Sequence, residues 1–353
     1  MKKILAIILA IFMISACLAS CSSSIDEQIA GSDSDLNANN GGSESSTNGV
    51  ENGTNAGNKV PDGPLYTLED DTLTFGYYPQ TNIVDTDLID VLNEKAGELP
   101  TSEDPQEWTS YEYCNNGSTS DYMWYIDVED EGVRYRGVYF ESYRPALRSD
   151  SSSSANSNQD DSLYHTETIH WFEYEPIVWK VLAEEEGKVL VLCESIIDAQ
   201  EYGVYSNSYA KSAIREWLNE RFYNTAFNEL QQEIILETTV DNSVASTGYP
   251  ANSYASENTE DKIFLLSRTE VKNSAYGFTA EYLRSKGVTD YAKSQGVYSD
   301  VTSAGWWWLR SPLNNGNANI THMIGTNGSM HSIDVAYSSG GVVPALWLSI
   351  VEE

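Results

Sequence analysis

The sequence predicts an α+β fold, built on a mainly antiparallel sheet with two or three helices and long loops. Segments of strand length come first along the chain, two segments with helical spacing follow, and strand-like segments separated by turn signals return in the last third. Strands and helices that are grouped along a chain, instead of alternating, typically form an antiparallel sheet with the helices segregated from it.

The first strands are expected on both sides of residue 180. Residues 73–78 alternate between apolar and polar side chains and end at Pro79, as a strand does. Residues 177–182 and 188–192 flank a turn of three glutamates and a glycine, which predicts a hairpin. The strands expected near the C-terminus are residues 306–310, 319–324, 329–335 and 343–350.

Two helices are expected between these groups of strands. Apolar side chains recur at helical spacing through residues 213–222. The second helix begins at Asn228, which has Gln231 at the capping-box position. Residues 267–270 repeat the capping-box pattern directly after the buried strand expected at 263–266, so a short third helix is predicted there.

The first 20 residues have the pattern of a signal peptide. Two lysines precede an apolar run over residues 4–13, which is too short to span a bilayer as a helix of about 20 residues. Residues 18–21 then read Leu-Ala-Ser-Cys, which resembles the lipobox of bacterial lipoproteins. The resemblance implies that Cys21 carries acyl chains such as palmitate, becomes the new N-terminus, and anchors the chain to the extracellular face of the bacterial cell membrane.

Two alternatives stand beside lipidation of Cys21. A weaker match to the same pattern ends at Cys17, and an ordinary secretory signal could carry an incidental cysteine. Cys21 is preferred because a polar serine run begins directly after it. Residues 21–63 are rich in Ser, Asn, Gly and Asp, which predicts a disordered tether, and residues 64–353 form the expected globular domain.

The net charge of −33 limits the partners of this chain. Binding to nucleic acid needs a basic stripe, so nucleic acid is excluded, and the membrane is expected to be reached only through the lipid. Acidic clusters at residues 127–131 and 184–186 allow Ca²⁺ as a cofactor, and no other cofactor is expected. The alternative is that these carboxylates form a solvated face that keeps the protein soluble.

Cysteine and histidine do not predict a metal centre. Only Cys114 and Cys193 follow Cys21, and Cys193 lies in an apolar run that predicts a buried free thiol. The two could also pair outside the cytoplasm. No histidine shows metal-ligand spacing to either cysteine.

Six motifs follow one another in a fixed order along the globular part. They lie at residues 75–80 (Phe-Gly-Tyr-Tyr-Pro-Gln), 176–182, 212–219, 261–267, 307–312 (Trp-Trp-Leu-Arg-Ser-Pro) and 341–348 (Gly-Val-Val-Pro-Ala-Leu-Trp-Leu). Together they resemble an uncharacterised extracellular domain-of-unknown-function family of lipoproteins from anaerobic Gram-positive bacteria. Residues 82–170 resemble an insertion found in some members. Val343 stands where the family pattern has arginine, so the partner of that arginine must be satisfied in another way.

The Trp-Trp-Leu-Arg-Ser block and the terminal Gly-Val-x-Pro-Ala motif are in turn similar to C-type-lectin-like folds of the sulfatase-modifying-factor group. This resemblance implies a C-type-lectin-like core and carries no function by itself. The Glu-Pro-Asn and Trp-Asn-Asp motifs of Ca²⁺-dependent lectins are absent.

The tryptophan block supplies the first candidate ligand site. In a strand, Trp306, Trp308 and Arg310 face one side, where indole rings suit sugars or cations and a planar guanidinium suits carboxylates. The alternative, favoured on general grounds, is that the indoles are core and that Arg310 pairs with a buried carboxylate.

The loop after this block supplies the second candidate. Asn314, Asn315 and Asn317 carry amides that can donate to and accept from sugar hydroxyls. The alternative is turn chemistry, because asparagine tolerates left-handed backbone conformations.

These observations favour a surface-anchored lipoprotein that presents a non-catalytic module for a glycan or a protein ligand. His322 and His331 lie on neighbouring expected strands, but no serine or cysteine nucleophile pairs with them in the sequence, so a hydrolase triad is not predicted. The alternatives are an extracellular enzyme acting on envelope or dietary polymers, which needs a cleft holding two carboxylates or a perturbed histidine, and a structural component of the envelope.

Overall fold

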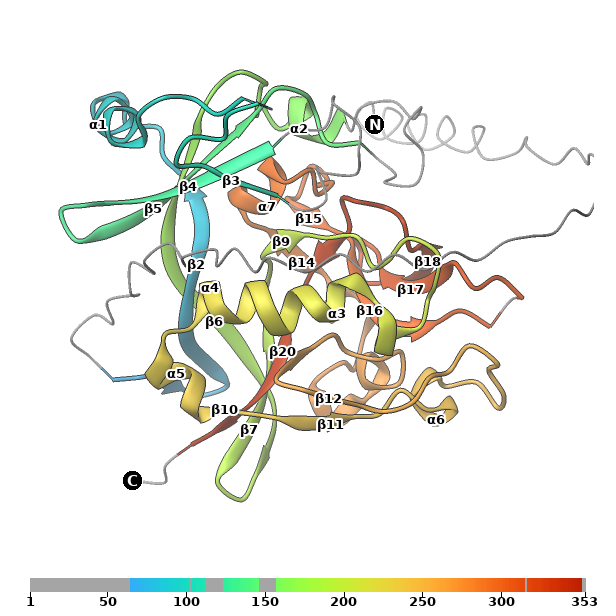
Figure 1. The fold of residues 1–353 in the computed structure, drawn as a ribbon. Helices are drawn as coiled ribbons and strands as arrows, with labels where there is room; N and C mark the ends of the chain where they lie inside the picture. Colours follow the sequence, from blue (N-terminus) through green and yellow to red (C-terminus); the bar gives the residue numbers. More distant parts are fainter. Residues whose placement is uncertain (1–63, 102, 112–122, 146–156, 315, 351–353) are drawn as a thin grey trace, which may run out of the picture. The chain divides into compact units, whose positions relative to one another are not determined.

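The computed structural model describes residues 64–101, 103–111, 123–145, 157–314 and 316–350 (Figure 1). Strand accounts for 38% of the structure and helix for 22%. The strand pairs are antiparallel except for two short parallel contacts. Cys21, Cys114 and Asn315 fall outside the described residues, as do the whole of the expected signal peptide and the whole of the expected tether.

The strands form one large sheet and three smaller ones. The strands of the large sheet are β1 (Thr67–Glu69), β2 (Thr72–Asn82), β3 (Thr109–Ser110), β4 (Met123–Asp130), β5 (Val133–Phe140), β6 (His170–Glu185), β7 (Lys188–Cys193), β10 (Ile235–Leu236), β13 (Ile263–Phe264) and β20 (Ala345–Ser349). A five-stranded sheet contains β9 (Asp198–Ala199), β16 (Trp307–Pro312), β17 (Ile320–Ile324), β18 (Met330–Asp334) and β19 (Gly341–Val342). The two smallest sheets contain β8 (Ser195–Ile196), β14 (Lys286–Val288) and β15 (Ala304–Gly305) in one, and β11 (Thr238–Val240) and β12 (Thr259–Asp261) in the other.

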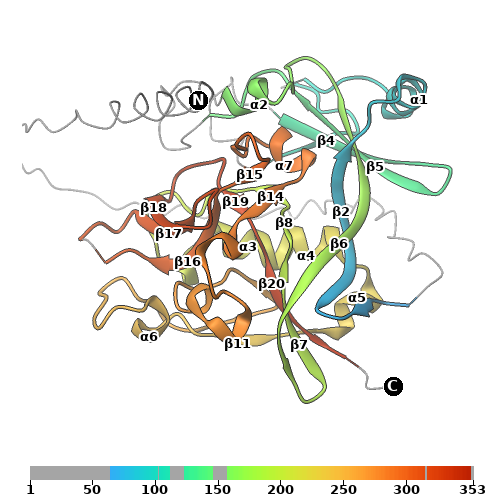
Figure 2. The same ribbon diagram turned by 180° about the vertical axis from the view of Figure 1, so that it is seen from behind.

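The helices are short. They are α1 (Thr86–Ala96), α2 (Ser157–Asp161), α3 (Ala213–Trp217), α4 (Tyr223–Ala226), α5 (Glu229–Ile234), α6 (Val244–Thr247) and α7 (Asp290–Ser294). Single turns of other helix types are η2 (Tyr209–Lys211), η3 (Leu218–Phe222), η4 (Glu270–Lys272), η5 (Ser274–Tyr276) and η6 (Glu281–Arg284). In Figures 1 and 2, α3, α4 and α5 lie against one face of the large sheet, and α1, the longest α-helix, lies beside β4 and β5.

The predicted α+β, C-type-lectin-like fold is wrong, because the protein is mostly antiparallel sheet with few, short helices. The local elements that supported the prediction are present, but the motifs do not specify which strands pair. The motif at 307–312 lies in the five-stranded sheet, where residues 341–342 of the terminal motif pair with it, whereas residues 345–348 of the terminal motif lie in the large sheet. The terminal motif therefore passes from one sheet to the other.

Several locally encoded elements are confirmed. Residues 177–182 and 188–192 form the β6–β7 hairpin. Asn228 and Gln231 form a complete capping box at the start of α5. The expected helix at 213–222 is α3 continued by the wider turn η3, and Ser212 caps it by accepting from the Arg215 amide at 3.3 Å. Local capping chemistry fixes where these helices begin.

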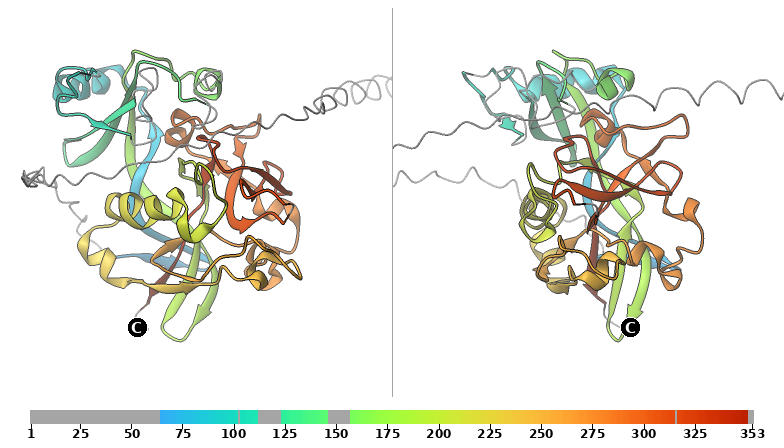
Figure 3. Two further views of the ribbon diagram at one scale, coloured as in Figure 1. Left: turned by 45° about the vertical axis from the view of Figure 1, so that its right-hand side comes forward. Right: turned by 90° about the vertical axis from the view of Figure 1, so that its right-hand side faces the viewer.

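Strand β6 is the centre of the large sheet. It pairs with β2 along one edge, and on the other edge with β5 near its start and with β7 near its end. Figure 3 shows β2 and β6 extending through the full height of the domain. Side chains of neighbouring β6 residues enter two hydrophobic clusters, Trp171 the smaller and Phe172 the larger, because successive strand residues face opposite sides of a sheet.

The smaller cluster belongs to residues 83–171, close to the insertion expected from the resemblance. It packs α1 against β4 and β5 around Leu92, Trp124 and Trp171. Gly137 lies under Trp171, where a Cβ would come within 2.8 Å of the indole ring. This part of the chain therefore has its own core while it shares β6 with the rest of the domain.

A buried polar contact joins β2 to the five-stranded sheet. The Tyr78 hydroxyl donates to Asp198 Oδ2 at 2.5 Å, and the Ala199 amide donates to Asp198 Oδ1 at 2.6 Å. Burial raises the pKa of Asp198 from 3.8 to about 6, although these hydrogen bonds and the charges of Arg144 and Arg136 oppose the shift. The folded protein therefore binds this proton more tightly than the unfolded chain does.

Replacing Asp198 by asparagine tests this consequence of burial. A carboxyl whose pKa is higher in the folded than in the unfolded protein makes its full contribution to stability below pH 3.8. This contribution is lost as the pH rises through about 6. The stability of the native protein relative to Asp198→Asn should therefore fall by up to about 3 kcal/mol over this interval. Urea unfolding at pH values from 3.5 to about 7 measures the difference. A difference that does not change with pH would contradict the shift, whatever constant effect the lost Tyr78 contact has.

Candidate functional site

The tryptophan block lies largely inside the domain. Trp307 and Trp308 on β16 are 0% exposed, and their indole N–H groups donate to Arg284 O at 3.1 Å and Gln200 O at 2.8 Å. Trp306 is half-buried and packs edge-on against Trp308 with ring centroids 4.9 Å apart. Trp308 therefore offers no ring face to a ligand in this structure. The indoles of Trp307 and Trp308 lie in the core, where the alternative interpretation placed them.

Arg310 is also buried, with 3% of its surface exposed. Its Nη1 donates to Glu270 Oε2 at 2.5 Å and to Leu265 O at 2.6 Å, and its Nη2 donates to Asp241 O at 3.2 Å. Burial raises the pKa of Glu270, but the charge and hydrogen bond of Arg310 outweigh burial, so the net shift is downward. Arg310 is thus paired with the carboxylate of Glu270, whose side chain is half-buried, where the alternative interpretation had a buried carboxylate.

The asparagine loop lies at the surface. Asn314 is exposed and donates to Ala251 O at 2.7 Å, and exposed Asn317 accepts from the Asn319 amide at 2.8 Å. The second contact is a typical asparagine turn. The loop remains accessible, but the Asn314 amide already binds Ala251 and the Asn317 amide already binds the loop's own backbone.

The two histidines on β17 and β18 have different partners. His322 is held between the Tyr249 hydroxyl at 3.0 Å and His331 O at 3.2 Å, and burial lowers its pKa to about 4. The Ser329 hydroxyl donates to Asn327 Oδ1 at 2.5 Å and lies 2.7 Å from His331 Nε2. In this arrangement the serine hydroxyl is held by Asn327 as well as by His331.

The acidic segment at 127–131 is occupied by basic side chains. Asp127 accepts from Arg136 at 2.8 Å through both oxygens and from Arg134 at 2.7 Å, and Asp130 lies 3.2 Å from Lys95. Among the residues that the structure describes, no three His, Cys, Asp or Glu side chains converge as metal ligands. Cys193 is a buried free thiol, as predicted, and burial raises its pKa to about 12.

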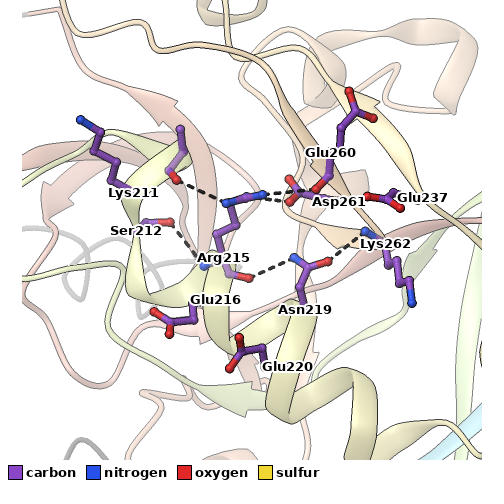
Figure 4. A pocket seen from close by; sticks show the side chains of 11 residues that line it. Lys211, Ser212, Arg215, Glu216, Asn219, Glu220, Glu237, Glu260, Asp261 and Lys262 are labelled. Carbon is purple, nitrogen blue, oxygen red and sulfur yellow. Dashed lines mark hydrogen bonds and ion pairs between the residues drawn. The ribbon is translucent and has the colours of Figure 1, made fainter.

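A surface pocket that the sequence analysis did not identify lies between α3 and β12 (Figure 4). Its volume is about 480 Å³. Ten of its eleven lining residues are polar or charged, and they come from two parts of the chain that are close only in the fold. The lining residues are Ala210, Lys211, Ser212, Arg215, Glu216, Asn219, Glu220, Glu237, Glu260, Asp261 and Lys262.

An ion pair between α3 and β12 forms the floor of this pocket. Arg215 Nε donates to Asp261 Oδ1 at 2.6 Å across 46 positions of sequence, and Thr259 donates to Asp261 Oδ2 at 2.6 Å. The Asp261 carboxylate is wholly buried, and burial raises its pKa against the opposing contacts with Thr259 and Arg215. Both oxygens of the buried carboxylate are therefore occupied, which makes Asp261 a structural anchor of the site.

Asn219 in η3 joins the end of α3 to the start of β13. Its Nδ2 donates to Arg215 O and Ile263 O, at 3.0 and 2.9 Å, and its Oδ1 accepts from the amides of Lys262 and Ile263, at 2.9 and 3.1 Å. A side-chain amide with all four contacts made leaves nothing for a ligand and fixes the two walls of the pocket relative to each other.

The pocket could have been suspected from two of the six motifs. Residues 212–219 and 261–267 both carried the family resemblance, and they meet here. Arg215 and Asn219 stand one helical turn apart, and Asp261 precedes a buried strand, so polar side chains within otherwise apolar motifs were the available signal. Their pairing was not predictable because it depends on how β12 packs against α3.

The fold and the pocket together define a β-rich domain with a polar surface site. Residues 186–350 match the family described as "Domain of unknown function (DUF6273)", and this match includes every residue of the pocket. No curated protein matches the chain, and no solved structure does. Over the described ranges, no helix has the length and apolar character to cross a membrane.

Replacing Arg310 by methionine tests whether it holds the fold. The substitution leaves the half-buried Glu270 carboxylate without its cation, so the free energy of unfolding should fall by about 2–3 kcal/mol. Adding Glu270→Gln should restore part of the loss, because the remaining side chain is neutral. Denaturant unfolding of the two variants and of the native protein measures both effects. Unchanged stability in Arg310→Met would contradict this assignment and return Arg310 to the candidates for ligand binding.

Proposed function

We propose that this chain is a lipoprotein anchored through Cys21 to the outer face of a bacterial membrane. Its globular part is a non-catalytic module that binds a polar ligand, from a glycan or a protein, in the Arg215 pocket. The observation that carries the second part is the pocket itself. Its volume lies within the range of ligand sites, roughly 300–1,000 Å³, and its walls are almost entirely polar.

The state of the pocket residues supports binding over catalysis. The buried carboxylate of Asp261 is tied to Arg215 and Thr259, so it is not free to exchange a proton with a substrate. The remaining carboxylates stand at the exposed edge of the pocket, where a bound group would meet them. A rigid polar floor with accessible groups around it suits recognition of a ligand by hydrogen bonds and charge.

The anchor is tested by replacing Cys21 with alanine. Cells producing the native protein and fed an alkynyl palmitate should label it, and the label should partition with the membrane fraction. Cys21→Ala should lose the label, because no thiol remains at the processing site. Cys17→Ala is the matched control and should keep both label and location. Labelling that persists in Cys21→Ala would contradict the assignment of Cys21.

The pocket is tested by filling it. The purified globular part is screened against a glycan array and a panel of peptides, and each ligand found is measured again with Ala210→Trp, since Ala210 lines the pocket. The bulky ring should abolish binding by occupying the site. Ala251→Trp, at an exposed position outside the pocket, should bind normally. A ligand that binds both variants equally binds elsewhere, and consumption of the ligand would favour the enzyme alternative.

A further inference from the structure

We propose that the ligand of the Arg215 pocket presents two or more cationic groups on an extended stem. Ammonium and guanidinium groups of this kind occur in oligoamines and in lysine- or arginine-rich peptide segments. The inference rests on the proposed function, because it specifies the chemistry of the ligand in the same pocket.

The cations at the floor of the pocket are already paired with acceptors of the protein itself. Arg215 donates hydrogen bonds from Nε to Asp261, from Nη1 to Ala210 O at 3.3 Å and from Nη2 to Glu260 O at 3.2 Å. Lys262 directs its ammonium at Tyr223, 2.9 Å from the hydroxyl and 4.3 Å from the ring centroid. Two of the three cations that line the pocket are therefore already engaged.

The third cation, Lys211, extends away from Arg215 in Figure 4. Ser212 is also occupied, since its hydroxyl donates to Tyr209 O at 2.8 Å and accepts from the Arg215 amide. An anionic ligand would thus meet cations that the protein has already paired. A ligand that donates several hydrogen bonds meets the carboxylates of the pocket instead.

Four glutamates offer the acceptors that such a ligand needs. Glu216 and Glu220 are one helical turn apart on the wall formed by α3 and η3, and Glu237 and Glu260 stand on the other wall. All four are exposed, and none forms an ion pair with another residue of the described part of the chain. Glu260 accepts one hydrogen bond, from Thr239 at 2.8 Å.

The arrangement suits an extended cation more than a single metal ion. Within the described residues these carboxylates do not converge as a group of metal ligands. Each exposed carboxylate contributes only weakly to an ion pair, about 0–1 kcal/mol, so useful affinity requires contacts to both walls at once. The net charge of −33 adds a long-range field that draws cations toward the domain.

Binding is measured by calorimetry on the globular part at low and at physiological ionic strength. The probes are a capped tri-lysine peptide, spermidine, and a capped tri-glutamine peptide as the neutral control. Both cations, or one of them, should bind and should bind less well at higher salt, because salt screens exposed charges. The peptide binding more tightly would identify a polypeptide source, and spermidine binding more tightly would identify an oligoamine.

The matched pair of variants separates a site from diffuse attraction. Glu216→Gln/Glu220→Gln should weaken binding roughly 3- to 30-fold at low salt, because two wall contacts are lost. Glu184→Gln/Glu186→Gln removes the same charge from the exposed β6–β7 turn and should leave the affinity unchanged. Neutral glutamines of the same size preserve the fold, and thermal unfolding of both variants verifies this.

Two results would overturn the inference. Equal weakening in both double variants would mean that the cations respond only to overall charge. Failure of both cationic probes, while another ligand binds and is lost in Ala210→Trp, would reject the cationic ligand and leave the proposed function intact. If Ala210→Trp changes the binding of no ligand at all, the proposed function fails as well.

Discussion

The pairing of the buried Arg310 with Glu270 is the interaction on which the arrangement around the pocket depends. A guanidinium withdrawn from water must find acceptors, and Arg310 takes them from Glu270, Leu265 and Asp241. Leu265 and Glu270 follow β13 and Asp241 follows β11, so one side chain on β16 fixes two other segments. Because β12 lies between those segments in the sequence, its Asp261 is brought into place to meet Arg215 from α3. The pocket is thus held by two arginine–carboxylate pairs at the ends of residues 261–270.

Local signals predicted elements well and pairings poorly. The capping box at Asn228 and the β6–β7 hairpin were predictable because every residue involved lies within a few positions of its partners. By contrast, β2 pairs with β6 across about a hundred positions, and nothing in either strand identifies the other, since both carry the same alternation. The C-type-lectin-like prediction failed at this level. It assigned an architecture from C-terminal motifs, whereas much of the large sheet is built by residues that precede them.

The candidate site shows the same limit in another form. Trp308 was a candidate ligand-binding residue because it is large and aromatic. Its large apolar surface is also the physical reason for its burial. Gly340 makes room for it, since a Cβ there would lie 1.8 Å from the indole nitrogen. Arg215 and Asp261 were not predicted as site residues, because a single charged residue in a helix or beside a strand is common. Their significance comes from being placed 2.6 Å apart, which no pattern in one sequence encodes.

The exposure of the glutamates constrains how a ligand could be held. Carboxylates in contact with water are screened beyond about 8 Å at physiological salt, so each contributes little and dissociation from a single pocket is fast. Tight attachment then requires either several contacts within one pocket or several pockets engaged together. The proposed lipid anchor would supply the second condition if many copies were displayed on one surface, because binding of one repeat of a polycation raises the effective concentration of the next. Surface display and a weak pocket with many contacts are therefore physically consistent parts of one proposal. The acidic charge of the chain would repel neighbouring copies, and a multivalent cation would bind two copies by the same charge.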